Sequence, residues 1–258
     1  MKAFRCLDPT VPGENARGFC ALAVMTKAPQ AGQVKTRLVP PLTPNEAAEL
    51  NKCFLRDTTA AISQICNCRP VGGAEEAGTN ACGVAVYTPI GAELAYVDIL
   101  PADFVLLPQR GESFGERLYF ASVDLFKCGF ESVCLIDSDS PTVPAEIFAQ
   151  AVNVLQRPGE RIVLGPSDDG GYYLIGLKKP HREVFERIDW STERVLDQTV
   201  RRAAESGLEV ELLPTGYDID DAAALRRLSD ELLGQNMRRS VAPNTRKFIA
   251  RIAAQNRL

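Results

Sequence analysis

The fold of this chain is decided by Ser132-Val133-Cys134-Leu135-Ile136-Asp137-Ser138-Asp139-Ser140-Pro141-Thr142. Its first half is an apolar run, which is typical of a strand buried on both faces in a parallel sheet. Ligands of such sheets bind beyond the carboxyl ends of the strands, where Asp137 and Asp139 would lie. Two carboxylates this close repel each other unless a cation or protons intervene, so a divalent metal is the natural hypothesis. The alternative is that both acids merely cap a turn and the next helix.

Size and charge exclude several classes of protein. A chain of 258 residues and 28.1 kDa can form one large α/β domain or two small ones. The formal charge of −4 argues against broad binding to nucleic acid or to a membrane surface. No apolar run approaches the roughly 20 residues needed to span a bilayer. Residues 1–18 lack the apolar core of a secretory signal, so we expect a short, loosely ordered leader, followed by one domain over 19–258.

The spacing of the cysteines gives little support to a zinc site or a disulfide framework. Eight cysteines are scattered along the chain without a Cys-x-x-Cys pair, and the sequence contains a single histidine. A zinc site or a disulfide framework would need closer or more regular spacing. We therefore expect reduced thiols and a cytoplasmic protein.

Apolar runs alternate with helical patterns along the chain. Strands are predicted over 19–26, 83–89, 104–107, 132–136, 161–165, 172–177 and 209–213, and residues 69–82 are predicted to be a loop. Alternating strands and helices predict a largely parallel sheet in one domain. The short link between 161–165 and 172–177 predicts one antiparallel strand in this sheet.

Capping signals locate the helices. Thr43 with Glu46, and Ser113 with Glu116, are capping boxes that predict helices beginning at 44 and at 114. Further helices are predicted from about 144 to 155, from Ser191 or 192 to about 206, from the acids at 218–221 to about 235, and over 244–255.

Three cations, Lys27, Lys35 and Arg37, lie in the loop after the first predicted strand. Gly32 permits a turn there, and backbone amides of such a loop can cradle an anion. The loop is neither a Walker A motif nor the Gly-x-Gly-x-x-Gly motif of dinucleotide-binding folds. Its position on the sheet edge expected for Asp139 favours phosphate binding over a merely solvated loop.

The stretch Asp168-Asp169-Gly170-Gly171 follows another predicted strand. Asp-Gly is common in turns, so the loop can be purely structural. If it faces the same crevice, Asp169 is a candidate second metal ligand or base, and the glycines allow a substrate to approach closely. Oxygen ligands of this kind suit Mg²⁺ or Mn²⁺.

Two other features have a structural and a functional interpretation. Trp190, the single tryptophan, precedes Ser191 and either packs against a helix start or offers a platform to a sugar ring. Asp218 and Asp220 are most simply helix caps, with a role in the site as the alternative.

Several of these stretches, in one order along the chain, resemble a known family. The similar segments are 23–38, 137–142, 165–176, 188–192 and 218–220. From about residue 19 to 230 the chain resembles the family called domain of unknown function 2064 (DUF2064), glycosyltransferases associated with arsenosugar biosynthesis in the GT-A-like nucleotide-diphospho-sugar transferase superfamily. One departure concerns the acidic motif, where the family often has Gly and Cys and this chain has Ile136 and Ser140.

The resemblance implies a single-domain, GT-A-like (Rossmann-like) α/β fold with a mixed, mainly parallel sheet flanked by helices. It implies a metal-dependent glycosyltransferase that moves a sugar from a nucleoside diphosphate to a small-molecule acceptor. Asp139 is then the direct ligand of Mg²⁺ or Mn²⁺, and Asp137 contacts the ribose or the metal shell. Asp169 would lie near the metal or the acceptor and is the candidate catalytic base.

The resemblance also assigns binding residues. Lys27, Lys35, Arg37 and Arg117 would hold the nucleotide or its diphosphate. The acceptor side would comprise Asp168, Gly170, Gly171, Trp190 and Ser191. We expect neither nucleic acid nor a membrane as a partner, and a monomer or a homodimer.

Three alternatives remain beside this interpretation. A nucleotidylyltransferase, on a related fold, would join a nucleoside triphosphate to a sugar phosphate or phospho-acid and release pyrophosphate. The Asp137-x-Asp139 spacing also resembles the nucleophile motif of haloacid-dehalogenase phosphatases, but Pro141 stands where that motif needs threonine. A non-catalytic nucleotide-binding module belongs to another class, and the intact acids argue against it.

Overall fold

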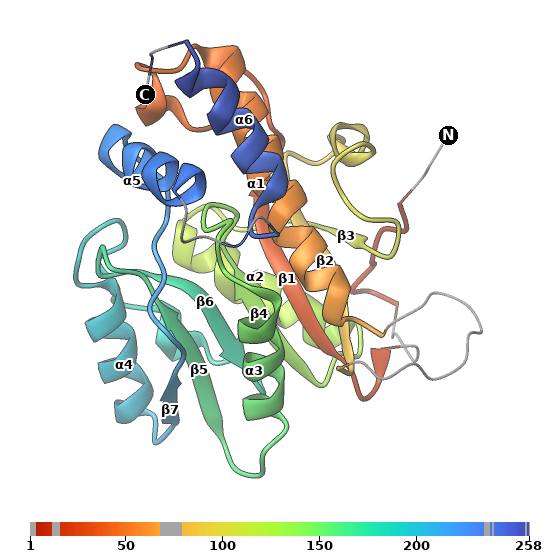
Figure 1. Ribbon diagram of the computed structural model, residues 1–258. Coiled ribbons are helices and arrows are strands. Elements are labelled where there is room, and N and C mark those ends of the chain that lie inside the picture. The colour runs from red at the N-terminus through yellow and green to blue at the C-terminus, as the bar shows by residue number, and fades with distance from the viewer. Residues whose placement is uncertain are drawn as a thin grey trace.

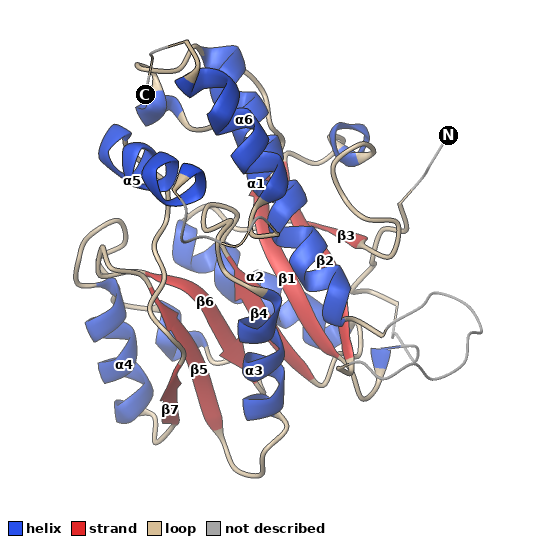
Figure 2. Ribbon diagram, in the orientation of Figure 1, coloured by secondary structure: helices blue, strands red, loops and turns tan. Residues whose placement is uncertain are grey.

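A seven-stranded sheet in the order β3-β2-β1-β4-β6-β5-β7 forms the centre of the computed structural model, which describes residues 4–11, 16–67, 79–234, 238, 240–255 and 257 (Figures 1 and 2). The strands are β1 (Cys20–Lys27), β2 (Ala81–Thr88), β3 (Val105–Pro108), β4 (Ser132–Ile136), β5 (Arg161–Pro166), β6 (Tyr172–Leu177) and β7 (Glu209–Leu212). Only β6 runs antiparallel to both of its neighbours, β4 and β5. The predicted α/β fold with a mixed, mainly parallel sheet is therefore confirmed.

Helices cover both faces of this sheet. They are α1 (Pro44–Ile65), α2 (Phe114–Lys127), α3 (Ala145–Leu155), α4 (Val195–Glu205), α5 (Ala222–Leu233) and α6 (Pro243–Ala253), with short 3-10 turns η2 (Thr36–Leu38), η3 (Glu93–Tyr96) and η4 (Arg182–Phe185). One face is buried by α1 and α3, through side chains such as Leu55 and Phe148. The other face is buried by α2 and α4, through Leu118 and Ala203. Among the described residues, no helix combines the length and the apolar character of a membrane span.

The two predicted capping boxes form as expected. Thr43 accepts from the backbone N–H of Glu46, while the Glu46 carboxylate accepts from the backbone N–H of Thr43 at 2.8 Å. Ser113 and Glu116 make the same reciprocal pair at the start of α2. Each pair satisfies two backbone donors that a helix start otherwise leaves unpaired. These local signals explain why the sequence located both helix starts correctly.

Topology brings several loops to one edge of the sheet. The parallel strands β1, β2, β3 and β4 end at this edge, and β5 and β7 end there too. The loops after β1, β4, β5 and β7 therefore meet, although they lie far apart in the sequence. This is the carboxyl edge at which open α/β sheets bind ligands.

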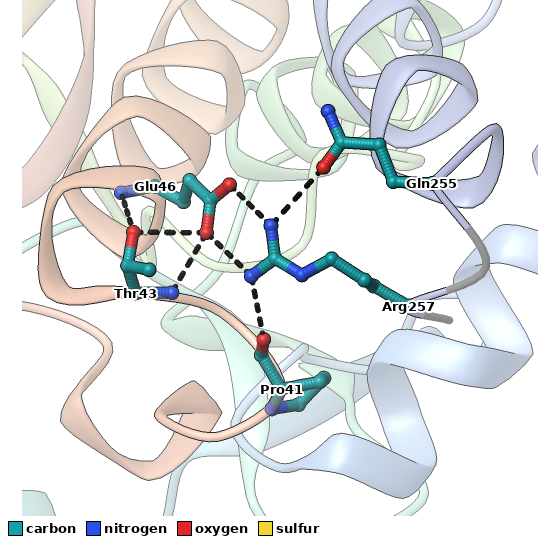
Figure 3. Close-up of polar contacts among 5 residues, drawn as sticks. All are labelled: Pro41, Thr43, Glu46, Gln255 and Arg257. Carbon is teal, nitrogen blue, oxygen red and sulfur yellow. Dashed lines mark hydrogen bonds and ion pairs between the residues drawn. The ribbon is translucent and has the colours of Figure 1, made fainter.

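The last helix is fastened to α1 by two carboxylates. The Asp57 carboxylate accepts from the backbone N–H groups of Asn244 at 3.0 Å and Thr245 at 2.8 Å, and so caps the start of α6. Past the other end of α6, the Arg257 guanidinium donates to both oxygens of Glu46, at 2.6 and 2.7 Å, and to the carbonyl of Pro41 (Figure 3). We call Asp57, Glu46 and Arg257 the fastening cluster. It ties the two helices together near both ends of α6.

Three predictions about local structure need correction or stay open. The helix expected from Ser191 begins at Val195, because Ser191 has a φ of 64° and the following residues form turns. Cys82 is disulfide-bonded, so the expectation of reduced thiols is wrong at this position. Residues 69–78 of the loop expected over 69–82 lie outside the described residues, and β2 already begins at Ala81.

The leader expected over 1–18 is described in part. Leu7 donates to the carbonyl of Leu106, and Leu106 donates to that of Arg5, so this short segment pairs with the edge strand β3. Residues 1–3 and 12–15 lie outside the described residues. A loosely ordered leader, followed by one domain over 19–258, stays a prediction.

Candidate functional site

A cleft of about 570 Å³ opens at the carboxyl edge of the sheet. The acids Asp137, Asp139, Asp169 and Asp220 line it together with aromatic residues. Among these, Phe114, Tyr172 and Trp190 make edge-to-face ring contacts, and we call these three residues the aromatic wall. A concave site with an apolar side and a few convergent charged groups is the usual form of a small-molecule binding site.

The acidic motif after β4 forms a tight turn. The backbone N–H of Asp137 still donates to Tyr173 at 2.9 Å, which continues the pairing of β4 with β6. Ser140 donates to the Asp137 carboxylate at 2.8 Å, and the backbone N–H of Asp139 donates to it at 3.3 Å. Asp137 is thus held by its own turn, whereas the Asp139 carboxylate is turned toward Lys35.

Lys35 joins the loop after β1 to two acidic segments. Its ammonium lies 2.9 Å from Asp139 Oδ2 and 2.9 Å from Asp220 Oδ1, and it donates to the carbonyl of Ile219 at 2.7 Å. The side chain is only 4% exposed. Burial alone would lower the pKa of Lys35, but the two carboxylates raise it above its usual range.

The acids near this lysine have shifted pKa values. Burial, reinforced by the charge of Asp139, raises the pKa of Asp137 to about 8. Burial, with the charges of Asp220 and Asp169, raises the pKa of Asp218 to about 6. Although burial also disfavours the charged form of Asp220, the Lys35 ammonium holds the pKa of Asp220 below its usual range. We call Asp137, Asp139, Asp218 and Asp220 the cleft cluster.

The two acids of the Asp-Asp-Gly-Gly loop have different partners. Asp169 lines the cleft and accepts from the backbone N–H of Gly171 at 2.9 Å. Asp168 instead pairs with Arg227 of α5. Gly170 has a φ of +89°, and a Cβ there would lie 2.1 Å from the Glu193 carbonyl oxygen, so only glycine fits. The loop is therefore packed against the segment that carries Trp190 and Ser191.

A smaller hollow of about 270 Å³ adjoins the cleft on the side of the basic loop. It is lined by Lys27, Lys35 and Arg37, and Arg37 also lines the main cleft. Lys27 is exposed and donates to Gln33 at 3.3 Å. Asn51 of α1 borders the hollow while only 4% exposed, and its buried Oδ1 has no hydrogen-bond partner. An unpaired buried oxygen beside three cations is a candidate contact for a ligand.

The remaining predicted residues divide between the cleft and its surroundings. Trp190 and Ser191 line the cleft, with the Trp190 ring edge-on to Phe114 at a centroid distance of 5.0 Å. Arg117 donates to the carbonyl of Glu112 at 3.0 Å and lies over Phe114. Arg117 thus supports the aromatic wall from behind in this conformation.

Sequence reasoning underrated one acidic segment. Asp218 and Asp220 were expected as helix caps, but the cap of α5 is Asp221, which accepts from the backbone N–H of Ala224 at 2.8 Å. Asp220 lines both the cleft and the smaller hollow, and the backbone N–H of Ile219 donates to the backbone carbonyl of Asp139 at 3.1 Å. The spacing Asp218-x-Asp220 repeats that of Asp137-x-Asp139, and this repetition could have revealed the segment.

The chemistry of these side chains fits a divalent cation. The charged donors are carboxylate oxygens, which suit Mg²⁺ or Mn²⁺. Burial raises the pKa values of Asp137 and Asp218, and like charge raises them further, so a bound cation would offset part of this effect. Within the described ranges, however, no three acidic, histidine or cysteine side chains stand close enough together to hold a metal ion.

Comparison with known proteins agrees with the fold. A crystal structure of a proposed nucleotide-diphospho-sugar transferase from Desulfovibrio desulfuricans is 29% identical, with a TM-score of 0.77, and the match covers 91% of this chain and 95% of that one. The search of curated proteins finds no match.

Two further structures are more distant. Glucosyl-3-phosphoglycerate synthase from Mycobacterium tuberculosis, in complex with Mn²⁺ and UDP, is 10% identical with a TM-score of 0.47, over 96% of this chain and 84% of that one. A cytidylyltransferase from Leptospira borgpetersenii is 9% identical with a TM-score of 0.46, over 92% and 94%. Scores this low lend no support to either activity.

The resemblance to the DUF2064 family that the sequence predicts is confirmed over part of the chain. The model of the family described as "Uncharacterized protein conserved in bacteria (DUF2064)" matches residues 76–192, which include the acidic motif after β4 and the Asp-Asp-Gly-Gly loop. The chain is therefore similar to the DUF2064 family over residues 76–192 and has the GT-A-like fold of nucleotide-diphospho-sugar transferases.

Proposed function

We propose that this protein is a metal-dependent glycosyltransferase that uses a nucleoside-diphosphate sugar as donor and a small molecule as acceptor. The main support for the proposal is that acids of the cleft cluster lie beside Lys35 and Arg37 at the carboxyl edge of the sheet. The 29% identical relative, itself a proposed nucleotide-diphospho-sugar transferase, supports the same class of donor.

The donor's charged part would bind between the basic loop and the acidic motif. Asp139, with Asp137 beside it, would hold a divalent cation, and when bound this cation would offset negative charge on the diphosphate. Lys27 and Arg37 would contact the diphosphate from the smaller hollow. Because these groups are positioned before the reaction, they would favour departure of the nucleoside diphosphate.

The acceptor would bind on the aromatic side of the cleft. Trp190 and Phe114 offer apolar surface on which the C–H face of a sugar ring or a planar group can pack. Asp169 lines the same cleft and would accept the proton of the attacking hydroxyl. The bond between the anomeric carbon and the diphosphate oxygen would break as the bond to the acceptor oxygen forms.

A thermal-shift screen tests the donor class. Nucleoside diphosphates and their sugars are added with and without Mn²⁺, and saturation at ~100 times Kd should raise stability by about 2.7 kcal/mol. The Asp139→Asn variant should lose the Mn²⁺-dependent part of the shift. The exposed α4 residue Asp197 gives a matched control, since Asp197→Asn removes an equal charge outside the cleft. Absence of any metal-dependent shift in the natural protein would sink the proposal.

The nearest alternative is a nucleotidylyltransferase, and the reaction products distinguish the two. A glycosyltransferase releases a nucleoside diphosphate, whereas a nucleotidylyltransferase releases pyrophosphate from a triphosphate. Incubation with both classes of nucleotide, followed by chromatography of the products, separates these outcomes. If ligands bind but neither product forms with any tested acceptor, a non-catalytic nucleotide-binding module becomes the better account.

A further inference from the structure

The Lys35 ammonium lies between two carboxylates of the cleft cluster, as a bound metal cation would. Its ammonium is shared by Asp139 and Asp220, with both distances at 2.9 Å, and the Ile219 carbonyl completes its contacts at 2.7 Å. At 4% exposure of the side chain, these three oxygens replace nearly all of its water. A buried ammonium needs such compensation, because desolvation of an unpaired charge is costly.

The backbone shows that this position is imposed by the surroundings. Lys35 has φ 49° and ψ 38°, in the left-handed region that residues with a Cβ rarely adopt. Such a conformation persists where neighbouring contacts fix it. The contacts come from three elements, namely the loop after β4, the segment before α5, and α1, whose Phe54 ring centroid lies 5.7 Å from the ammonium.

The arrangement limits what Asp139 can bind. Its Oδ2 is already paired with the ammonium, and its Oδ1 accepts from Ser138 at 3.2 Å. A divalent cation that binds Asp139 through Oδ2 therefore competes with the ammonium for the same oxygen. Lys35 can give up that one contact and keep two, because Asp220 and the Ile219 carbonyl belong to another segment.

We propose that Lys35 is a built-in counter-ion that competes with the divalent cation for Asp139. In the metal-free protein it neutralises Asp139 and tethers the loop after β1 to the 218–220 segment. When the cation binds, Lys35 releases Asp139 and stays on Asp220. This inference rests on the proposed function, since it concerns the cation of the same site. It makes Lys35 a positioning residue that sets metal affinity, in addition to any contact with the donor.

Binding of Mn²⁺ without nucleotide tests the competition directly. Free Mn²⁺ is measured by electron paramagnetic resonance during titration of the natural protein and of Lys35→Met, which keeps the length of the side chain and removes its charge. The variant should bind Mn²⁺ at least about tenfold more tightly, because the competing charge at 2.9 Å is gone. The metal-free variant should also melt at a lower temperature, and Mn²⁺ should restore more of that loss than it adds to the natural protein.

Lys27→Met is the matched control. It removes a charge from the same loop, but Lys27 is exposed and its hydrogen-bond acceptor is Gln33 rather than a carboxylate. Its loss should change Mn²⁺ affinity by less than about threefold, since charges in solvent are screened. Should Lys35→Met fail to fold, Lys35→Gln retains a donor for Asp220 and carries the same expectation.

The outcomes separate this inference from the proposed function. If the natural protein binds Mn²⁺ and a folded Lys35 variant binds it equally or more weakly, the competition is refuted while the metal site stands. An equal gain in Lys27→Met would also refute it, because the effect would then be general electrostatics. If the natural protein binds no Mn²⁺ and neither Lys35 variant does, both the inference and the metal dependence fall.

Discussion

The fastening cluster and the cleft cluster both join distant parts of the chain through carboxylates, but they differ in how fully those carboxylates are satisfied. In the fastening cluster, Asp57 accepts from two backbone N–H groups and the Asn244 side chain. Glu46 accepts from its capping-box partner and from both arms of Arg257. The hydrogen bonds from Arg257, with that from Thr43, lower the pKa of Glu46 to about 2.

The carboxylates of the cleft cluster are less fully satisfied. A single ammonium, that of Lys35, serves both Asp139 and Asp220. Burial and like charge raise the pKa values of Asp137 and Asp218, to about 8 and about 6. Satisfied carboxylates stabilise the fold, whereas buried carboxylates with raised pKa values at a cleft are candidates for a functional site. The same chemical group, a carboxylate, therefore has a structural role in the fastening cluster and a proposed functional role in the cleft cluster.

The largest expected effect is on turnover. Asp139→Asn should lower the rate of nucleoside-diphosphate release by about 10²- to 10³-fold, because a group that positions charge in the transition state is lost. The melting temperature without metal should fall, because the substitution removes one of the two carboxylates that pair with the buried Lys35 ammonium. Turnover is measured with the donor identified by the thermal-shift screen, and Asp197→Asn serves as control. A variant with unchanged turnover would place the chemistry elsewhere.

The next effect is on stability. Asp57→Ala should cost about 3 kcal/mol, because the substitution leaves buried donors at the start of α6 without a partner. Urea unfolding measures the loss, and donor binding by the folded variant should be unchanged. If donor affinity fell together with stability, the two clusters would not be as independent as their geometry indicates.

Arg257→Met should give a smaller loss, and that loss should depend on pH. The pKa of Glu46 lies near 2 in the folded protein and near 4.3 when unfolded. Its pairing therefore stabilises the fold above about pH 4 and loses this effect as the pH falls toward about 2. Melting temperatures of both proteins between these values should converge on acidification. A constant difference would show that Arg257 acts through packing rather than charge.

The smallest effect concerns the smaller hollow. Asn51→Leu removes an unpaired buried oxygen, so stability should stay equal or rise slightly. Affinity for a nucleoside diphosphate should fall by about fivefold, the value of one hydrogen bond. Thr58 of the same helix supplies the control, because its hydroxyl is also buried and unpaired but lies outside the residues that line the hollow. Equal affinity in Asn51→Leu and Thr58→Val would remove Asn51 from the site.

Most of the fold could be predicted from local sequence signals. The capping boxes at Thr43 and Ser113 located two helix starts, and the apolar runs located the strands because burial on both faces leaves little room for polar residues. The start of α4 was misplaced, since the left-handed conformation of Ser191 and the contact of Gly170 with Glu193 depend on tertiary packing. The disulfide at Cys82 likewise had no local signal.

The site was predictable in part. Asp137 and Asp139 could be placed at the carboxyl edge of the sheet from the sequence, Asp169 was a candidate for the same crevice, and the structure brings all three to the cleft. The contact of Lys35 with Asp220 spans 185 positions, and no pattern in the sequence encodes it. Asp168 was expected at the acceptor side, but its pairing with Arg227 directs it to α5. Which of two adjacent acids faces the cleft is a matter of turn geometry.

Calorimetric titration of Mn²⁺, with and without a nucleoside diphosphate, tests the central claim most directly. The cleft cluster should bind one Mn²⁺, the nucleotide should tighten this binding at least about tenfold, and the reciprocal gain should appear in nucleotide affinity. Asp139→Asn should abolish both the site and the coupling. Binding that is absent, or that survives unchanged in Asp139→Asn, would contradict the account.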